Sequence, residues 1–353
     1  MKKLYYLFAV LAIPALIITS CVVDNQPNTP YYRPGDEPID TVAPVDTPVV
    51  PVDTSVTPID TTVTPIDTTD TSSFVSGAFS VSAYQQVRFA PGNLQFNAAL
   101  GTHQCADGTT QNGTWRFAEH QWDYVGDSES GNVYHNGVKC NNANISETYD
   151  GWIDLFGWGT SGWNSGANAY QPWSTSTSYS DYYPGGNENN DLTGAYAYAD
   201  WGVYNQIGSD APGTWRTLTY AEWNYVYSGR ANADNLHGQA TVNGVNGFVL
   251  LPDDWVTPDG ISFTAGASLE FTANTYTESQ WKQMEQHGAV FLPAAGYRDG
   301  SDVDGVGLGG YFWSVSQYSS YDAWGLYFSD GYSNMVNGDY RYIGQSVRLS
   351  QDL

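Results

Sequence analysis

The C-terminal stretch Gly309–Leu353 reads GGYFWSVSQYSSYDAWGLYFSDGYSNMVNGDYRYIGQSVRLSQDL and decides how the rest of the chain is interpreted. Its apolar pieces, Tyr311–Ser314, Leu326–Phe328 and Ser346–Leu349, are typical of strands that form a scaffold. Between them lie runs of Tyr, Ser, Asn, Asp and Gly. Binding loops use this composition, because rigid aromatic rings give contact area and small polar groups give adaptable hydrogen bonds. The stretch therefore predicts a recognition surface on a fixed scaffold.

Residues 309–345 supply the candidate contacts. Aromatic side chains would anchor a ligand, and the small polar residues between them would be hydrogen-bonding partners. Turns are expected at Ser329-Asp330-Gly331 and at Asn337-Gly338. The candidate ligand-binding residues are Tyr318, Ser319, Tyr321, Asp322, Trp324, Tyr327, Asp330, Tyr332, Asn334, Asn337, Asp339, Tyr340 and Tyr342.

Composition and charge exclude several classes of partner. The chain has 353 residues, of which 15% are aromatic, enough for a substantial core. It carries 12 Lys and Arg against 37 Asp and Glu, a formal net charge of -25. Such a chain would be repelled by a phosphate backbone, so nucleic acid and anionic membrane surfaces are not expected partners.

The N-terminal residues have the pattern of an export signal. Lys2-Lys3 precede the apolar run Leu4–Ile18, which is too short to favour a membrane-spanning helix. Ile18-Thr19-Ser20-Cys21 then resembles a bacterial lipobox. We expect residues 1–20 to be a lipoprotein signal peptide and Cys21 to be the lipidated residue, so that a lipid anchor attaches the protein to a membrane.

A linker is expected between the anchor and the folded part, over residues 21–73. The tetrapeptide Pro-Ile/Val-Asp-Thr recurs from Pro38 to Thr68 every six or seven residues, too short a period for a solenoid unit. Regular prolines and repelling aspartates favour an extended spacer.

The folded part is expected at residues 74–353, because all 13 tryptophans lie after Phe74. Two helices have capping-box signals, Thr219–Glu222 ahead of Trp223 and Thr277–Gln280 ahead of Trp281, with Gly288 as a C-terminal stop. Short strand-like pieces occur throughout, so an α+β domain is predicted. The expected strands are Val87–Ala90, Leu94–Phe96, Trp115–Ala118, Phe248–Leu251, Val290–Leu292, Tyr311–Ser314, Trp324–Phe328 and Ser346–Leu349.

Two earlier blocks, Trp115–Gly126 and Trp152–Trp163, are rich in tryptophan and glycine. Tryptophan rings stack on the apolar faces of sugars, so these blocks are candidates for a sugar-binding groove. Core packing is the stronger interpretation, because glycines between tryptophans let backbone approach a ring closely.

Three blocks near the C-terminus carry a resemblance to a known family: Leu292–Gly300 (LPAAGYRDG), Gly310–Ser314 (GYFWS) and Arg341–Leu349 (RYIGQSVRL). Their order and spacing resemble the C-terminal half of the formylglycine-generating-enzyme-like branch of the C-type lectin fold, also described as sulfatase-modifying-factor-like. Val87–Leu94 and Trp115–Gly126 resemble surface lipoproteins of gut anaerobes in the same group. The resemblance implies a C-type-lectin-like domain with many short strands and two helices.

Within that superfamily the chain is most similar to the variable proteins of diversity-generating retroelements. In those proteins an error-prone reverse transcriptase changes codons at adenines while the scaffold stays fixed. The candidate contact residues, except Trp324, and also Ser329, Ser333 and Ile343 can all be reached in this way. The resemblance implies a variable region at 309–349. A fixed relative without a retroelement would have almost the same sequence.

An enzymatic function is the other possibility that the resemblance raises. Formylglycine-generating enzymes hold copper between paired cysteines late in the domain, whereas this domain has only Cys105 and Cys140, both early. We therefore expect no catalytic residues, and a disulfide between Cys105 and Cys140. The five histidines show no metal-binding spacing.

One Gly-rich loop has the composition of a calcium site. Asp299, Asp302 and Asp304 offer hard oxygen ligands, but their spacing is not that of an EF-hand. The prediction is no cofactor and no metal, with these three aspartates as a weak calcium candidate.

The sequence thus predicts a lipoprotein of the outer membrane, directed to the cell surface, that binds a protein or glycan non-covalently through 309–345. The alternatives are a fixed carbohydrate-binding or adhesin-type lipoprotein and, less favoured, a formylglycine-generating-like enzyme.

Overall fold

A computed structural model describes residues 76–353, except for the side chains of residues 335–337. These residues lie within one compact unit and combine short strands with few short helices, so the predicted α+β class is confirmed. The predicted signal peptide, Cys21 and the whole of the predicted linker lie outside the described residues. None of the helices in residues 76–353 is long and apolar enough to cross a bilayer.

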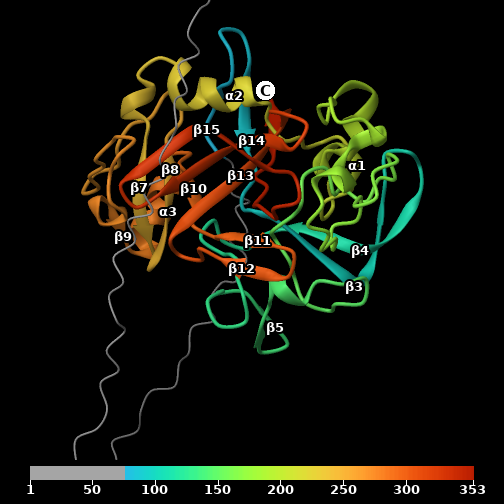
Figure 1. The fold of residues 1–353 in the computed structure, drawn as a ribbon. Coiled ribbons are helices and arrows are strands. Elements are labelled where there is room, and N and C mark those ends of the chain that lie inside the picture. The colour runs from blue at the N-terminus through green and yellow to red at the C-terminus, as the bar shows by residue number, and fades with distance from the viewer. Residues whose placement is uncertain (1–75) are drawn as a thin grey trace, which may run out of the picture. The chain divides into compact units, whose positions relative to one another are not determined.

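The strands form several small sheets. Two matter most for the candidate contacts: the antiparallel sheet β13–β14–β15 and the hairpin β11–β12 that lies near it (Figure 1). The strands are β1 Phe79–Ser80, β2 Gln86–Phe89, β3 Leu94–Gln104, β4 Thr110–Phe117, β5 Tyr134–His135, β6 Val138–Lys139, β7 His237–Val242, β8 Val245–Leu250, β9 Thr275–Tyr276, β10 Val290–Pro293, β11 Tyr297–Asp299, β12 Asp302–Asp304, β13 Gly309–Gln317, β14 Asp322–Ser329, β15 Tyr332–Tyr340 and β16 Ser350–Asp352. The sheet orders are β10–β8–β7–β9 and β1–β2–β16, and β3 pairs with β4 and β5 with β6.

Both predicted helices are present with their capping boxes. Thr219 caps α2, Tyr220–Asn224, and Thr277 caps α3, Glu278–Gln286, each with the reciprocal bond from the third helical residue. The chain of α2 continues as a π-helical turn, Tyr225–Gly229. A third short helix, α1 at Trp201–Tyr204, carried no predicted signal. Gly288 has φ +88° directly after α3, the left-handed conformation that suits a helix stop.

The sheet β13–β14–β15 is packed on both faces, and this position decides where the candidate contacts lie. On one face, Phe312, Leu326 and Phe328 join a core with Trp223 and Val226 from the helical segment that begins at α2. On the other, Trp313 packs against a second core that contains Trp158 and Phe156. Consecutive residues such as Phe312 and Trp313 are both buried, one on each face, as a strand between two packed layers requires.

Two predictions about the C-terminal stretch are wrong. Ser346–Leu349 is not a strand: it is a buried extended segment that meets β13 only at the isolated bridge Phe312–Ser346, and β16 begins after it. Asn337-Gly338 is not a turn, because both residues lie inside β15, opposite Gly325 and Trp324. The turn at Ser329-Asp330-Gly331 is confirmed, with Gly331 at φ +75° between β14 and β15.

The predicted disulfide is also wrong. Cys105 and Cys140 are both buried and both free. Cys105 follows β3 beside Thr109 and Tyr204, whereas Cys140 packs with Val125, Val133 and Trp152. The two thiols occupy separate environments, and burial raises the pKa of each.

The tryptophan-rich blocks are mostly core, as the stronger interpretation expected. Trp115, Trp122, Trp152 and Trp158 are buried, and so are the helix residues Trp223 and Trp281. Trp163 is only partly buried. It lines a pocket that is described below.

Gly310 offers a direct test of the sheet packing. A Cβ at this position would lie 2.1 Å from the ring of Phe328, which is itself in the core. We expect Gly310→Ala to lower the free energy of unfolding by about 1–3 kcal/mol in urea titrations. The neighbouring Gly309→Ala is the matched control, because its Cβ would meet nothing closer than 3.3 Å. Equal stability of the two variants would contradict the packing described.

Asp154 makes the fold sensitive to pH. Burial raises the pKa of Asp154 to about 6, although hydrogen bonds from Asn142 and Val125 favour the carboxylate. The unfolded value is near 3.8, so the folded state binds more protons between these pH values. This contribution to stability is therefore present at low pH and is lost as the pH rises through about 6. From pH 4 to pH 7 we expect the stability of the wild type relative to Asp154→Asn to fall, by at most about 3 kcal/mol. A difference that is constant across this range would contradict the raised pKa.

Candidate functional site

The three sequence blocks that carried the family resemblance meet in space. Gly296 bridges Gly310, Arg298 bridges Gly344, and Phe312 bridges Ser346. Each bridge joins two different blocks among 292–300, 310–314 and 341–349. We call these three blocks the frame. Their three bridges connect β11, β13 and the C-terminal segment.

Two buried arginines, Arg348 and Arg298, stabilise the frame through hydrogen bonds. Arg348 is fully buried and donates to Asn93 Oδ1 at 2.9 and 3.1 Å, to Phe291 O at 2.8 Å and to Ala90 O at 3.3 Å. Arg298 donates to the carbonyls of Gly300 and Leu155. Burial lowers the pKa of Arg348 to about 9 and that of Arg298 to about 10. Neither forms an ion pair within residues 76–353. Their N–H groups instead donate to backbone carbonyls and, for Arg348, also to the side chain of Asn93.

A third arginine holds the loop between β13 and β14. Arg341 donates to Ser319 O at 2.7 Å, Glu188 O at 2.8 Å and Gln317 Oε1 at 3.1 Å. Its guanidinium also lies over the rings of Trp158, 4.7 Å from the centroid, and Tyr183, 5.2 Å away. The loop that carries Tyr318 to Tyr321 is thereby tied to the core.

A row of four tyrosines crosses the frame, made of Tyr297, Tyr311, Tyr327 and Tyr332. Consecutive ring centroids are 5.2, 4.8 and 5.8 Å apart. Tyr311 and Tyr327 are directly opposite each other on β13 and β14, so their side chains share a face. Burial and the neighbouring phenol of Tyr327 raise the pKa of Tyr311. We call this set the tyrosine row.

Further polar and aromatic groups lie beside the tyrosine row. Asn334, opposite Tyr327, donates to the Tyr332 hydroxyl at 2.7 Å. Tyr340 and Tyr342 stack at 5.3 Å. Burial raises the pKa of Asp339, which accepts from Gln345 Nε2 at 2.9 Å.

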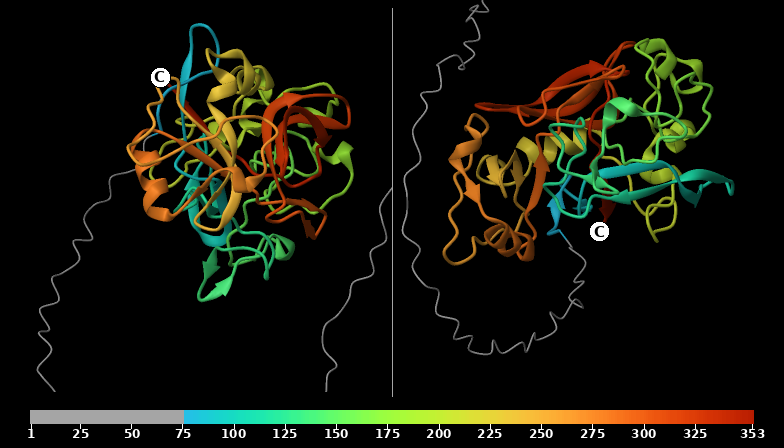
Figure 2. Two further views of the ribbon diagram at one scale, coloured as in Figure 1. Left: turned by 90° about the vertical axis from the view of Figure 1, so that its left-hand side faces the viewer. Right: turned by 90° about the horizontal axis from the view of Figure 1, so that it is seen from below.

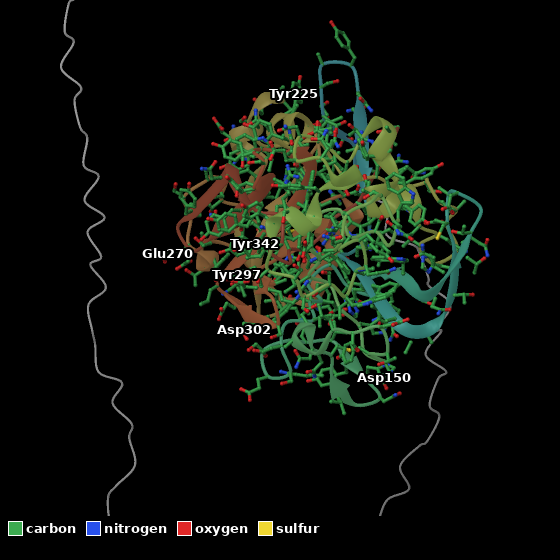
Figure 3. The ribbon with its side chains drawn as sticks, turned by 45° about the vertical axis from the view of Figure 1, so that its right-hand side comes forward. Asp150, Tyr225, Glu270, Tyr297, Asp302 and Tyr342 are labelled. Atoms are coloured by element: carbon green, nitrogen blue, oxygen red, sulfur yellow. The ribbon has the colours of Figure 1, made fainter. Side chains whose placement is uncertain are left out.

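Tyr342 and Tyr297 are seen on the same side of the molecule in Figure 3, and the bridge between Arg298 and Gly344 brings their segments together. Charge on Asp299 adds to burial in raising the pKa of Tyr342, and charge on Asp304 does the same for Tyr297. The tyrosine row therefore has an acidic surrounding, and any partner that it meets has to tolerate negative charge.

Other candidate contacts lie elsewhere. Trp324 faces α2, where it stacks on Tyr220 at 4.2 Å and contacts Tyr318 at 4.4 Å. This is the side of Leu326 and Phe328, whereas Tyr327 between them belongs to the opposite face. The structure thus divides the candidate aromatic contacts between two faces of one sheet.

The other predicted contact residues are engaged in local structure. Ser319 Oγ donates to Asp322 Oδ2 at 2.9 Å and orders the turn before β14. Asp330 Oδ1 accepts from the backbone N–H of Phe271 at 2.7 Å. Tyr321 lies edge-on to Tyr179, 4.4 Å away. The backbone of Asn337 pairs with Gly325, and its side chain is outside the description.

The structure therefore brings together Tyr327, Tyr332, Asn334, Asp339 and Tyr342. Two members of the tyrosine row, Tyr297 and Tyr311, were absent from the predicted contacts. The sequence assigned Tyr311 to the scaffold. Tyr311 shares a face with the fully buried Trp313, so its position opposite Tyr327 becomes visible only with the register of the sheet.

The weak calcium candidate gains no support. Asp299 and Asp302 pair across the hairpin β11–β12 and Asp304 pairs with Tyr297. Within residues 76–353, no group of three or more His, Cys, Asp or Glu side chains is placed to hold a metal ion.

Comparison with known proteins gives one match. A family model described as a domain of unknown function (DUF8237) matches residues 266–350. No curated protein and no solved structure matches the chain significantly. The matched segment is well under half of the chain, but it contains the tyrosine row and all three blocks of the frame. The frame and the row thus lie within a single recurring sequence unit.

Arg341 tests the support of the β13–β14 loop. We expect Arg341→Lys to lower the free energy of unfolding by about 2–3 kcal/mol, because all three hydrogen bonds come from Nη2 at the tip of the guanidinium. An ammonium loses that reach together with the contact of the planar guanidinium with the rings of Trp158 and Tyr183. Thermal unfolding followed by circular dichroism measures this. Arg88→Lys is the control, since Arg88 is exposed on β2 and should change stability by no more than about 0.5 kcal/mol. An Arg341→Lys variant as stable as this control would contradict the role.

Proposed function

We propose that this protein is a lipid-anchored surface protein that binds a ligand non-covalently through the tyrosine row and the groups beside it. The observation that carries the proposal is the arrangement of the row on a rigid support. The four rings are in successive contact, with centroids 4.8 to 5.8 Å apart, and the strands that carry Tyr311 and Tyr327 also contribute buried residues to two cores. Within the row, Tyr332 is 44% exposed and Tyr297, Tyr311 and Tyr327 are partly exposed, so a ligand can reach the rings.

A protein surface is the ligand we favour. Tyrosine offers a large, rigid contact area at low cost in conformational entropy, and Asn and Asp add adaptable hydrogen bonds. The acidic groups beside the row, among them Asp299, Asp304 and Asp339, favour a partner with basic side chains.

The C-type-lectin-like fold is part of the proposal. It is supported by the α+β class, by the two helices with capping boxes and by the way the three resemblance blocks bridge one another. The resemblance to formylglycine-generating enzymes does not extend to their chemistry in this proposal, since Cys105 and Cys140 are in separate environments. Binding without turnover is the proposed activity.

Diversification of 309–349 by a retroelement is also proposed. The pattern of burial in β14 supports it. Tyr327, a residue reachable by changes at adenine, is partly exposed, whereas its neighbours Leu326 and Phe328 are buried in the core. Changes at the outward positions would leave the cores intact. A fixed adhesin with the same scaffold is the alternative.

Attachment to the outer membrane, facing the cell surface, completes the proposal. It rests on the sequence pattern of residues 1–20 and Cys21 and on the extended composition of 21–73. The linker would separate the binding domain from the lipid anchor.

The exposed tyrosines allow a test of binding that leaves the fold intact. Full-length protein is screened on an array of purified surface and secreted proteins, and each hit is measured again with the double variant Tyr332→Ala/Tyr340→Ala. We expect affinity for the hit to fall at least about tenfold, because central aromatic contacts dominate binding energy. Tyr84→Ala is the control, since Tyr84 is 100% exposed in the turn between β1 and β2.

Unchanged affinity in the double variant, with near-ultraviolet circular dichroism like that of the wild type, would contradict the proposed face. So would an equal loss in the Tyr84 control, because it would show that any exposed tyrosine contributes.

A further inference from the structure

A second site lies beside the hairpin β3–β4. The hairpin β3–β4 and the segment that carries β9 and α3 are at opposite ends of the molecule in two views (Figures 1 and 2). Between this hairpin and residues 162–173 is a pocket of about 590 Å³, within the range of small-ligand sites. None of its lining residues belongs to the tyrosine row, the frame or the segment matched by the family model.

The polar wall of the pocket is held by a chain of hydrogen bonds. Gln111 Nε2 donates to Gly162 O and to the Tyr204 hydroxyl, both at 3.1 Å. The Tyr204 hydroxyl in turn donates to Asp107 Oδ2 at 3.0 Å. Thr109 holds the other oxygen of Asp107 through its N–H at 2.9 Å and its hydroxyl at 2.6 Å. The groups that would meet a ligand are therefore already oriented.

Gly162 is required for this closeness. It has φ +92°, and a Cβ there would lie 2.7 Å from Gln111 Oε1. The glycine in the sequence Gly162-Trp163 thus lets the backbone approach Gln111 while Trp163 is placed on the pocket wall.

The aromatic wall consists of two tryptophans that are both partly exposed. Trp173 stacks on Phe96 with 5.9 Å between ring centroids and 21° between planes, so only one of its faces is covered by that contact. Trp163 lies edge-on to Tyr198 at 5.6 Å. Each ring is supported from behind and lines the pocket.

The charges in the pocket restrict the chemistry of a ligand. Its lining contains Asp107 and Glu147 but no lysine, arginine or histidine. Hydrogen bonds from Thr109 lower the pKa of Asp107, so this carboxyl is ionised at neutral pH. Phosphate, sulfate and carboxylate groups would be repelled. Carboxylates and amides do accept from and donate to hydroxyl groups, and tryptophan faces pack on the apolar C–H faces of a sugar ring.

We propose that this pocket is a binding site for an uncharged saccharide, with Trp173 and Trp163 stacking on sugar rings and Asp107, Gln111 and Gln171 bonding to hydroxyls. The site is separate from the tyrosine row. The protein accordingly has two binding surfaces, one for a neutral glycan and one for the ligand of the tyrosine row.

The test uses an array of uncharged oligosaccharides of two to six units, with sialylated and sulfated oligosaccharides on the same slide. Full-length protein should bind at least one uncharged glycan and none of the charged ones. For the best uncharged glycan, measured by calorimetry, Trp173→Ala should weaken binding at least tenfold.

Asp107→Asn is a second variant, which tests the site even if Trp173→Ala does not fold. The amide keeps the shape of the side chain and an acceptor for Tyr204 but loses the charge, and the affinity should fall about three- to tenfold. The double variant Tyr332→Ala/Tyr340→Ala should bind the glycan as the wild type does.

Three results would overturn the inference: no uncharged glycan binds, the bound glycans are the charged ones, or both pocket variants bind as tightly as the wild type. Loss of glycan binding in the Tyr332/Tyr340 variant alone would assign the glycan to the tyrosine row and would also overturn the inference.

Discussion

The buried guanidinium of Arg348 is the interaction on which the rest of the domain depends. It sits in the C-terminal segment and donates to oxygens from the loop before β3 and from β10, parts of the chain that are far apart in sequence. No carboxylate neutralises it within residues 76–353. Removing it would leave several buried acceptors unpaired at once, which costs more than a typical hydrogen bond contributes. Arg298 acts similarly on the loop around Leu155, so the frame is closed by donors that reach backbone carbonyls.

This rigid support explains how a binding surface can differ in sequence while the fold is kept. In β14, Ala323, Leu326 and Phe328 are buried in two cores, whereas Tyr327 is partly exposed and its ring contacts those of Tyr311 and Tyr332. Some polar residues of 309–349 cannot vary without affecting the fold. Ser333 is buried and bonded to Tyr227, and Asp330 caps the backbone at Phe271, so both also serve the fold. Diversity is therefore expected to concentrate on the row and the groups beside it.

Local signals in the sequence were sufficient for some features and not for others. The capping boxes at Thr219 and Thr277 were predictable because all of their partners lie within three residues. Strand β15 was missed because Asn337-Gly338 is typical of a turn, and only pairing with β14 keeps it extended. The sequence HGQATV of β7 has no clear alternation, and this strand exists because it pairs with β8. The disulfide was inferred from the number of cysteines, which says nothing about the separate surroundings in which the two thiols lie. The tyrosine row combines residues from β11, β13, β14 and β15, a grouping that becomes visible only with the register of the sheet.

The central claim is that the outward residues of 309–349 form a binding surface that varies on a constant frame. Sequencing the DNA that adjoins the coding region tests it most directly. The account predicts a reverse-transcriptase gene and a near-copy of the 309–349 coding stretch that differs from it only at adenines, in codons for outward residues such as Tyr327 and Tyr332. The absence of any such copy, or differences that fall mainly in codons for buried residues such as Phe312 and Phe328, would contradict the account.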